Sequence, residues 1–283
     1  MRNLLIIATA FCALPLLGQT TILNETWSDG ERSIQSLPNS AAWYSSGSGN
    51  LTANVGSMTQ MLTNTTAMDI AYFTDAYGFV VSPAVGQTLE LAYSISFINR
   101  TSPSQSYFRV GLYNTIVDPR ITADGGSTAN SAYLGATGYM LNTGGLNPGV
   151  NLDLRRRTST TSQNLMSSTS AYATLSGNTT FQANVDNDVI YDGVLRITRT
   201  GELINTIEAT LTAPDDTVVF SFATTDSTSV YKDFNTVAFI SGGANGDSFK
   251  LTSVNITLVP EPGASAFAVM GALALAFRRK RTS

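Results

Sequence analysis

The stretch Gln87–Asn99, QTLELAYSISFIN, decides the fold class of this 283-residue chain. From Leu89 to Phe97 every second side chain is apolar, and the side chains between them are small or polar. Alternation over this length predicts a β-strand that buries one face and turns the other face to solvent. The expected buried residues are Leu89, Leu91, Tyr93, Ile95 and Phe97.

The same alternation recurs along the chain. Phe108, Val110 and Leu112 follow a Ser/Pro turn, so we expect their strand to pair antiparallel with Gln87–Asn99. Thr200–Glu202 is predicted to be a turn between two more strands. The remaining predicted strands are 195–197, Leu203–Leu211, Val218–Ala223, Val237–Ile240 and Phe249–Leu258, with a bulge where the apolar parity switches between Leu251 and Val254.

The polar composition also favours strands. Charged residues make up only 13% of the chain, and Thr, Ser, Asn and Gly supply most of its polarity. No stretch of the body has a sustained helical period, and no linker divides it. The sequence therefore predicts one all-β domain over residues 20–258, an antiparallel two-sheet sandwich of the jelly-roll type.

The N-terminus reads MRNLLIIATAFCALPLLGQTT. One cation, Arg2, precedes an apolar run from Leu4 to Leu17, and polar residues follow, which is the pattern of a secretory signal peptide. We assign residues 1–19 to this signal and expect the mature chain to be exported. Its removal takes away Cys12, the single cysteine, and the sequence contains no histidine.

The absence of Cys and His from the mature chain excludes several kinds of catalytic and metal site. A mature chain without Cys and His has no disulfide, no Ser-His or Cys-His nucleophile pair and no imidazole metal site. Five of the 16 cations and one of the 20 acids lie in the two terminal segments, which leaves 11 cations, 19 acids and a net charge of −8 on the body. An anionic body argues against a nucleic-acid partner, because phosphates need basic side chains.

Residues 259–283 form a separate C-terminal segment. From Gly263 to Phe277 every residue except Ser265 is apolar or small. As a helix this run is about 22 Å long, shorter than the roughly 30 Å hydrocarbon core, but snorkelling cations can complete a marginal transmembrane helix. By the positive-inside rule the body then lies outside. The alternative is a terminal helix packed on the body. The membrane-stop cations are Arg278, Arg279, Lys280 and Arg281.

The triplet before that run completes a recognisable pattern. Pro260, Glu261 and Pro262, the apolar segment and the basic cluster together resemble the PEP-CTERM sorting signal of Gram-negative bacteria. The resemblance implies an exosortase-type enzyme that recognises the triplet and processes the tail. It also implies a membrane-anchored form before processing, and then a place at the cell surface or in the extracellular matrix of a species that makes exopolysaccharide.

The body resembles concanavalin A-like jelly rolls. An early strand with Trp27 leads into the turn Ser28–Arg32, and a central strand reads YFRVGLYN over Tyr107–Asn114. A late hairpin, VLRITRTGELINTIEATL, and a closing FKLTSVNITL complete the pattern. The resemblance implies the fold of lectins, of glucanases and of extracellular modules without activity, so the fold alone does not assign a function.

Retaining glucanases of this fold carry a strand motif E-x-D-x-E or E-x-D-x-x-E, which places two acids on one face of a strand. The chain has no match. Its nearest approach, Glu25–Asp29–Glu31, has the wrong spacing, and we expect these acids to be solvated at a turn. We therefore predict no enzyme activity, with a glycoside hydrolase that uses an unrecognised carboxylate pair as the alternative.

The sequence offers one set of metal-ligand candidates. Asp186, Asp188 and Asp192 present carboxylates within a short stretch that suits Ca²⁺, although the order of an EF-hand loop is absent. The alternative is a polar loop between strands. No other cofactor is indicated.

Two groups are candidate glycan contacts. Arg155, Arg156 and Arg157 can pair with the carboxylates or sulfates of an anionic polysaccharide, and the alternative is a solvated strand end. Trp43 and Tyr44 can offer aromatic faces to sugar rings, and the alternative is a place in the core.

Three classes of function remain open. The leading interpretation is an exported, non-catalytic surface or matrix protein, sorted through its tail and associated with exopolysaccharide. The second is a lectin-like module with a defined carbohydrate site, and the third is the glycoside hydrolase. The expected partners are the exosortase, the membrane and extracellular polysaccharide.

Overall fold

The computed structural model describes residues 18–46, 50–62, 66–100, 107–117, 119–125, 127–175, 179–242 and 247–260. The predictions for residues 1–17 and 261–283 lie outside this range, including Glu261, Pro262, the apolar run and the four cations of the tail. In the described ranges there is no helix with the length and apolar character that a membrane span requires.

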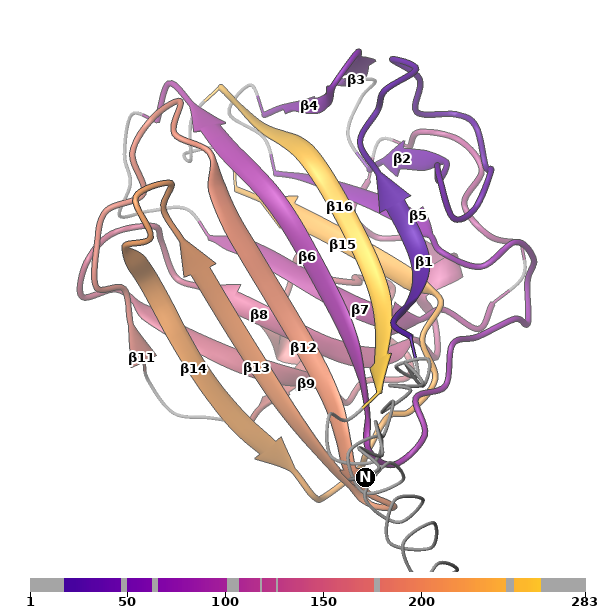
Figure 1. The fold of residues 1–283 in the computed structure, drawn as a ribbon. Helices are drawn as coiled ribbons and strands as arrows, with labels where there is room; N and C mark the ends of the chain where they lie inside the picture. Colours follow the sequence, from indigo (N-terminus) through magenta and orange to yellow (C-terminus); the bar gives the residue numbers. More distant parts are fainter. Residues whose placement is uncertain are drawn as a thin grey trace, which may run out of the picture.

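Two antiparallel sheets pack face to face (Figure 1). This arrangement confirms the predicted all-β, two-sheet sandwich. The first sheet has the order β14 (Val218–Asp226), β13 (Ile204–Thr212), β12 (Tyr191–Gly201), β6 (Gln87–Ile98), β16 (Ser248–Pro260), β4 (Ser57–Met61) and β3 (Leu51–Asn54), with β1 (Thr20–Glu25) paired to β16. The second has the order β10 (Tyr172–Thr174), β9 (Asn151–Arg157), β8 (Thr137–Thr143), β7 (Phe108–Asn114), β15 (Thr236–Ser241), β5 (Ala67–Tyr72) and β2 (Trp43–Ser45), with β11 (Thr179–Thr180) paired to β9.

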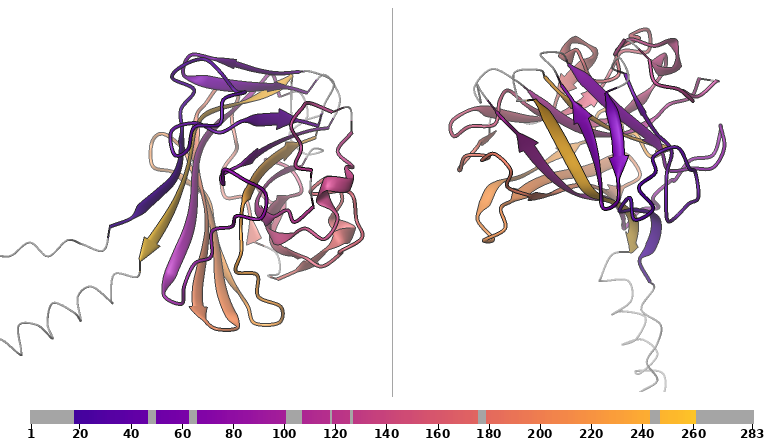
Figure 2. Two further views of the ribbon diagram at one scale, coloured as in Figure 1. Left: turned by 90° about the vertical axis from the view of Figure 1, so that its right-hand side faces the viewer. Right: turned by 90° about the horizontal axis from the view of Figure 1, so that it is seen from above.

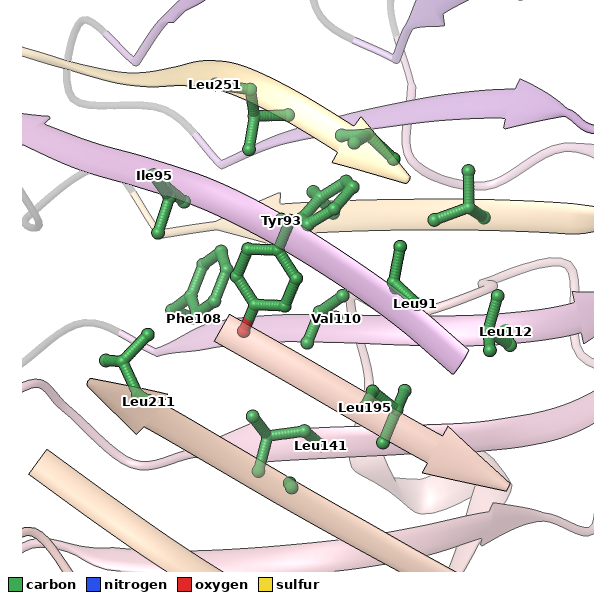
Figure 3. Close-up of a cluster of buried hydrophobic side chains, with 14 of the residues drawn as sticks. Leu91, Tyr93, Ile95, Phe108, Val110, Leu112, Leu141, Leu195, Leu211 and Leu251 are labelled. Carbon is green, nitrogen blue, oxygen red and sulfur yellow. The ribbon is translucent and has the colours of Figure 1, made fainter. Parts of the chain in front are cut away.

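The space between the sheets holds the main core. β6 turns its alternate apolar side chains inward, as its sequence predicts, and they meet the inward residues of β7 and β15 (Figure 3). Aromatic rings fill the centre: the Tyr93 and Phe239 centroids are 5.3 Å apart, and those of Phe97 and Phe108 are 5.5 Å apart, both edge to face. Such contacts stabilise a sandwich beyond the burial of area alone.

One predicted pairing is wrong. β6 and β7 were expected to form an antiparallel pair, but β6 pairs with β12 and β16 in the first sheet, whereas β7 pairs with β8 and β15 in the second. The chain crosses from one sheet to the other after Asn99, which has a positive φ of 52°. The two strands therefore meet through side chains across the core and not through backbone hydrogen bonds.

The late strands agree with the sequence. β12 and β13 pair antiparallel around the turn at Glu202–Leu203, and β16 carries a register shift between Leu251 and Ser253, where a bulge was predicted. β16 also runs further than expected. Val259 and Pro260 pair with Thr88 and Gln87, so the last two residues of this strand belong to the sandwich.

The centre of the second sheet is buried on both faces. All six residues of β5 and all six of β15 are buried. Figure 2 (left) shows the loops that follow β7 and β9 on the side of this sheet that faces away from the first sheet. These loops contain the short 3-10 turns Ser131–Tyr133 and Thr169–Ala171. The loops and the sheet share a second apolar cluster: Met68, Ile70, Tyr72, Tyr113, Tyr133, Ala136, Met140, Leu165, Met166, Ala171, Tyr172, Ala238 and Ile240.

Candidate functional site

The predicted aromatic platform lies mostly inside the protein. Trp43 is 0% exposed, and its ring centroid is 5.8 Å from that of Trp27 and 6.2 Å from that of Phe239. Tyr44 points to the opposite face of β2 and is half-buried against the second cluster. A ring in the core cannot stack on a sugar in solution, so the interpretation of Trp43 as a glycan contact is corrected to a core residue.

The basic run in β9 is also structural. Arg155 pairs with Asp153 on the outer face, with Nε 2.6 Å from Oδ1. Arg156 points inward and pairs with the buried Asp226 of β14 at 2.6 Å, where the hydroxyl of Tyr139 also donates to this carboxylate. Successive residues of a strand face opposite sides, so Arg155 and Arg156 cannot form one common patch. Both side chains are instead held in ion pairs. These contacts fit neither of the two predictions, a patch for anionic polysaccharide or a solvated strand end.

Arg157 holds the loops that cover the second sheet. It is fully buried, and its guanidinium donates to five backbone carbonyl oxygens at 2.7–3.2 Å. The five planar N–H donors of arginine suit such a convergence of carbonyls. These carbonyls belong to both covering loops, and they are those of Tyr133, Ala136, Ser162, Asn164 and Leu165.

The described strands of the second sheet carry two acidic residues, which lie on opposite faces. Asp153 points outward and accepts bonds from Arg155 and from Asn142. Asp69 points into the core, and burial raises the pKa of its carboxyl well above the usual range, against smaller lowering effects of Ser45 and Arg32. A retaining hydrolase needs two carboxyl groups about 5–5.5 Å apart on one face. These two acids do not meet that geometry.

The acids near the N-terminus have mixed roles. Asp29 and Glu31 are exposed at the turn, as expected. Glu25 is buried instead, and its carboxylate accepts bonds from the backbone N–H groups of Trp27 at 2.8 Å and Ala41 at 3.0 Å. Its structural role corrects the expectation of a solvated turn acid, because it satisfies two N–H groups where the chain leaves β1.

The calcium candidates occupy three different places. Asp192 lies on the outer face of β12 and accepts a bond from the Ser94 hydroxyl at 2.6 Å. Asp188 has a positive φ of 60°, and its N–H donates to the Phe97 carbonyl. Asp186 lies in a groove at the end of the sandwich. Within the described ranges no three His, Cys, Asp or Glu residues are grouped for a metal ion.

That groove is the candidate functional site, and we call it the end groove. It has a volume of about 260 Å³ and is lined by Arg100, Asn147, Asn184, Val185, Asp186 and Asn187. Hydrogen bonds from backbone N–H groups join the three contributing loops. Arg100 N–H donates to the side-chain oxygen Oδ1 of Asn187 at 2.8 Å. Asp188 N–H donates to the Phe97 carbonyl at 2.9 Å, and Val185 N–H donates to the Leu146 carbonyl at 3.3 Å. The groove is therefore held in shape by the fold.

The end groove offers both donors and acceptors. Asn184, Asp186 and Asn187 are exposed, whereas Arg100 and Asn147 are half-buried. Nη2 of Arg100 makes only long bonds, 3.3 Å to the Leu146 carbonyl and 3.4 Å to Asn147 Oδ1, and its buried Nε has no partner among the described residues. Burial lowers the pKa of Arg100, and Tyr191 and Asp186 act against this shift.

Sequence analysis missed most of this groove. It singled out Asp186 alone, because Arg100, Asn147 and Asn184 come from loops that are far apart in the chain. Only Arg100 directly follows a predicted strand, Gln87–Asn99, and the loops around Asn147 and Asn184 have no such neighbour among the predicted strands.

Comparisons with known proteins agree on the fold. No family model matches the chain, and no curated protein matches it. Among solved structures, an endo-1,3-beta-glucanase from Streptomyces sioyaensis has a TM-score of 0.50 at 12% identity, over 87% of this chain and 99% of that one. Peanut lectin with a 9mer peptide has a TM-score of 0.48 at 10% identity, over 86% and 98%. The likeness to the glucanase shows the fold alone, and it agrees with the antiparallel two-sheet sandwich predicted from the sequence.

Proposed function

We propose that this protein is an exported, non-catalytic module that binds carbohydrate in the end groove. The observation that carries the proposal is the set of side chains in the groove: one guanidinium, one carboxylate and three amides. Sugar hydroxyls both donate and accept hydrogen bonds, and these groups provide both partners. Nη2 of Arg100, whose bonds to the Leu146 carbonyl and to Asn147 Oδ1 are long at 3.3 and 3.4 Å, adds a charged donor for a ligand oxygen.

The dimensions of the groove suggest weak binding at each site. Its volume of about 260 Å³ lies just below the range of about 300–1,000 Å³ that is usual for small-molecule pockets. We therefore expect one or two sugar units of a longer chain to be held. Many copies displayed on one surface would bind a polymer more tightly through multivalency.

The absence of catalysis is part of the proposal. It is supported by the opposite orientation of Asp69 and Asp153, by the pairing of Asp153 with Arg155, and by the lack of histidine in the chain. Release of new reducing ends from a bound polysaccharide, lost when one particular acid is changed, would favour the glycoside hydrolase instead.

The binding experiment measures, by calorimetry, the titration of the full chain with laminarin, with alginate oligosaccharides and with galactose in turn. The test variant is the double substitution Asn184→Ala and Asp186→Asn, both at exposed positions. We expect it to weaken binding about tenfold or more, because each lost hydrogen bond corresponds to about 1 kcal/mol. Asn255→Ala, on the outer face of β16, is the matched control and should bind like the wild type. Equal binding by the double variant would reject the groove.

The export route is proposed on the two terminal segments. Residues 1–19 would direct export and 259–283 would be the sorting signal, with a transient membrane anchor and an exosortase-type enzyme as partners. Pro260 ends β16 and pairs with Gln87, so the triplet begins at the last pair of the sheet. Proline lacks the N–H needed to continue the ladder, which is consistent with an end of the sheet at this residue.

A substitution in the triplet tests this route. In a host with an exosortase, Glu261→Ala should still insert in the membrane but should keep its tail, as measured by the mass of the product in membrane and surface fractions. The wild type is the control. A Glu261→Ala product with the same mass and location as the wild type would leave the tail as a plain membrane anchor.

A further inference from the structure

Both ends of the described chain leave the sandwich at the same end of its strands. Thr20, at the start of β1, pairs with Leu258, and Pro260 pairs with Gln87, at the start of β6 (Figure 1). Only Glu261 and Pro262 separate Pro260 from the apolar run that begins at Gly263. The three Cα–Cα steps from Pro260 to Gly263 span at most about 11 Å.

This short connection limits where the sandwich can sit. A bilayer has about 5–7 Å of headgroup layer on each side of its hydrocarbon core. If residues 263–277 enter a membrane, as the proposed function requires, Pro260 lies within about 6 Å of the outer border of the headgroups. The side chains around Pro260 must then face lipid headgroups.

Apolar side chains are exposed at this end of the sandwich, near the start of β6 and the turn between β12 and β13. Leu203 is 73% exposed in the β12–β13 turn, and Ile204 and Val85 are also exposed. Backbone bonds place them beside the end of β16, because Gly86 N–H donates to the Arg199 carbonyl and Gln87 pairs with Pro260. The turn therefore lies near the point from which the tail leaves.

A second group lies beside β1. Phe79 is 67% exposed, and Tyr77 and Val80 are exposed as well. Phe79 and Val80 border an open groove of about 530 Å³ whose other wall includes Thr21 and Ile22 of β1. This group therefore adjoins the strand that begins next to Leu258.

The exposure of this second group is fixed by the fold. Arg120 donates to the carbonyl oxygens of Thr74 at 2.6 Å and Ala76 at 2.7 Å. The Tyr77 hydroxyl donates to the Ile116 carbonyl at 2.6 Å, and Phe79 N–H donates to the Ala76 carbonyl at 3.3 Å. These bonds hold the segment in a turn that keeps Phe79 in solvent, where a large apolar side chain has no stabilising contact.

We propose that these residues form an apolar rim that rests on the membrane entered by residues 263–277, and this proposal depends on the membrane anchor in the proposed function. Phe and Tyr rings are well suited to the boundary between headgroups and hydrocarbon. The net charge of −8 on the body disfavours anionic lipid, so the expected surface is zwitterionic. The rim consists of Tyr77, Phe79, Val80, Val85, Leu203 and Ile204.

Docking on the rim would orient the end groove. β6 has 12 residues and runs from Gln87, beside the rim, to Ile98, two residues before Arg100. At about 3.3 Å per residue this strand is about 40 Å long. The end groove would thus face the medium, at the far end of the sandwich from the membrane.

The experiment uses the full chain with Cys12→Ser in phosphatidylcholine proteoliposomes. Phe79→Cys and Leu203→Cys each carry an environment-sensitive NBD dye, and lipids with a doxyl spin label act as quencher. Val55→Cys is the matched control, because Val55 is 78% exposed in the β3–β4 turn, at the opposite end of the molecule in Figure 1. We expect a blue shift and strong quenching at positions 79 and 203, and neither at position 55.

The outcomes separate the rim from the anchor. Carbonate extraction at high pH should leave the protein in the membrane. Retained protein with the same emission at positions 79, 203 and 55 would overturn the rim alone. Protein released by carbonate would overturn the anchor in the proposed function, and the rim with it.

Discussion

The outer faces of the two sheets are built differently. On the first sheet, β6 exposes Thr88, Glu90, Ala92 and Ser94 in part, and the alternate apolar residues from Leu89 to Phe97 point into the core. On the second sheet, β5 and β15 have no exposed residue, because two loops cover them with the second apolar cluster. The same strand geometry therefore gives one open, polar face and one closed face.

This difference bears on where a ligand can bind. A sheet face filled by its own loops leaves no broad surface for a polysaccharide, and neither the end groove nor the groove beside Phe79 and Val80 lies on the polar face of β6, β12 and β13. The end groove combines concavity with several polar groups. We expect buried polar groups to contribute more to the stability of the closed face than ion pairs contribute to the stability of the open face.

The largest effect is expected from Arg157→Met. Methionine has a similar length but no donors, so five buried carbonyl oxygens lose their partner. We expect the free energy of unfolding to fall by about 3–5 kcal/mol, because unpaired buried polar groups are costly. Urea denaturation measures the loss, and hydrogen exchange should show faster exchange at Gly135 N–H, which bonds to the Thr160 carbonyl.

Arg155→Met is the matched control for this experiment. Arg155 pairs with a partly exposed Asp153 on the same strand, so its loss should cost about 1 kcal/mol or less. Equal losses for the two variants would show that Arg157 does not hold the loops on the second sheet.

An intermediate, pH-dependent effect is expected from Asp69→Asn. Burial raises the folded-state pKa of Asp69, so the folded protein binds a proton more tightly than the unfolded chain. The stabilising contribution is complete below the unfolded-state pKa of about 4 and is lost as the pH rises towards the folded-state pKa, at up to about 1.4 kcal/mol per pH unit. The variant should lack this loss and should be the more stable protein at pH 7.

Unfolding of both proteins between pH 4 and pH 8 measures this effect. Asp192→Asn, at an exposed position on the first sheet, is the control and should keep the pH dependence of the wild type. Parallel stability curves for the wild type and Asp69→Asn would contradict a folded-state pKa of Asp69 that is raised by burial.

The smallest effect is expected on the open face. Arg196 pairs with Glu90 across β12 and β6 at 2.5 Å, but its side chain is 41% exposed. A double-mutant cycle with Arg196→Gln and Glu90→Gln should give a coupling energy below about 1 kcal/mol, reduced further by salt. A coupling as large as the loss in Arg157→Met would remove the contrast between the faces.

The open face was also the more predictable one from sequence. Period-two alternation predicted β6, β13 and β16 close to their observed bounds, including the bulge after Leu251, but only residues 195–197 of β12. Strands of the second sheet alternate less clearly, because a strand buried on both faces has no polar side. For the same reason local pattern could not assign β7 to the opposite sheet from β6.

The buried arginines show a second limit. Arg155, Arg156 and Arg157 are three consecutive arginines with different roles. Arg155 forms an ion pair on the outer face, and Arg156 forms an ion pair between the two sheets. Arg157 donates hydrogen bonds to five carbonyl oxygens. The face of the strand on which each side chain lies separates them, together with partners such as Asp226 and the Tyr133 carbonyl that are distant in the chain. The end groove was missed for the same reason, since it depends on three loops that tertiary structure brings together.

The most direct test of the central claim is to map the ligand contact by NMR. The full chain, with its Asn side-chain amides labelled, is titrated with the glycan that binds best in calorimetry. We predict shifts for Asn147, Asn184 and Asn187 in the end groove, and none for Asn142 on the closed face of the second sheet. Shifts at Asn142 with an unchanged groove would contradict the claim that this protein binds carbohydrate at the end of its sandwich.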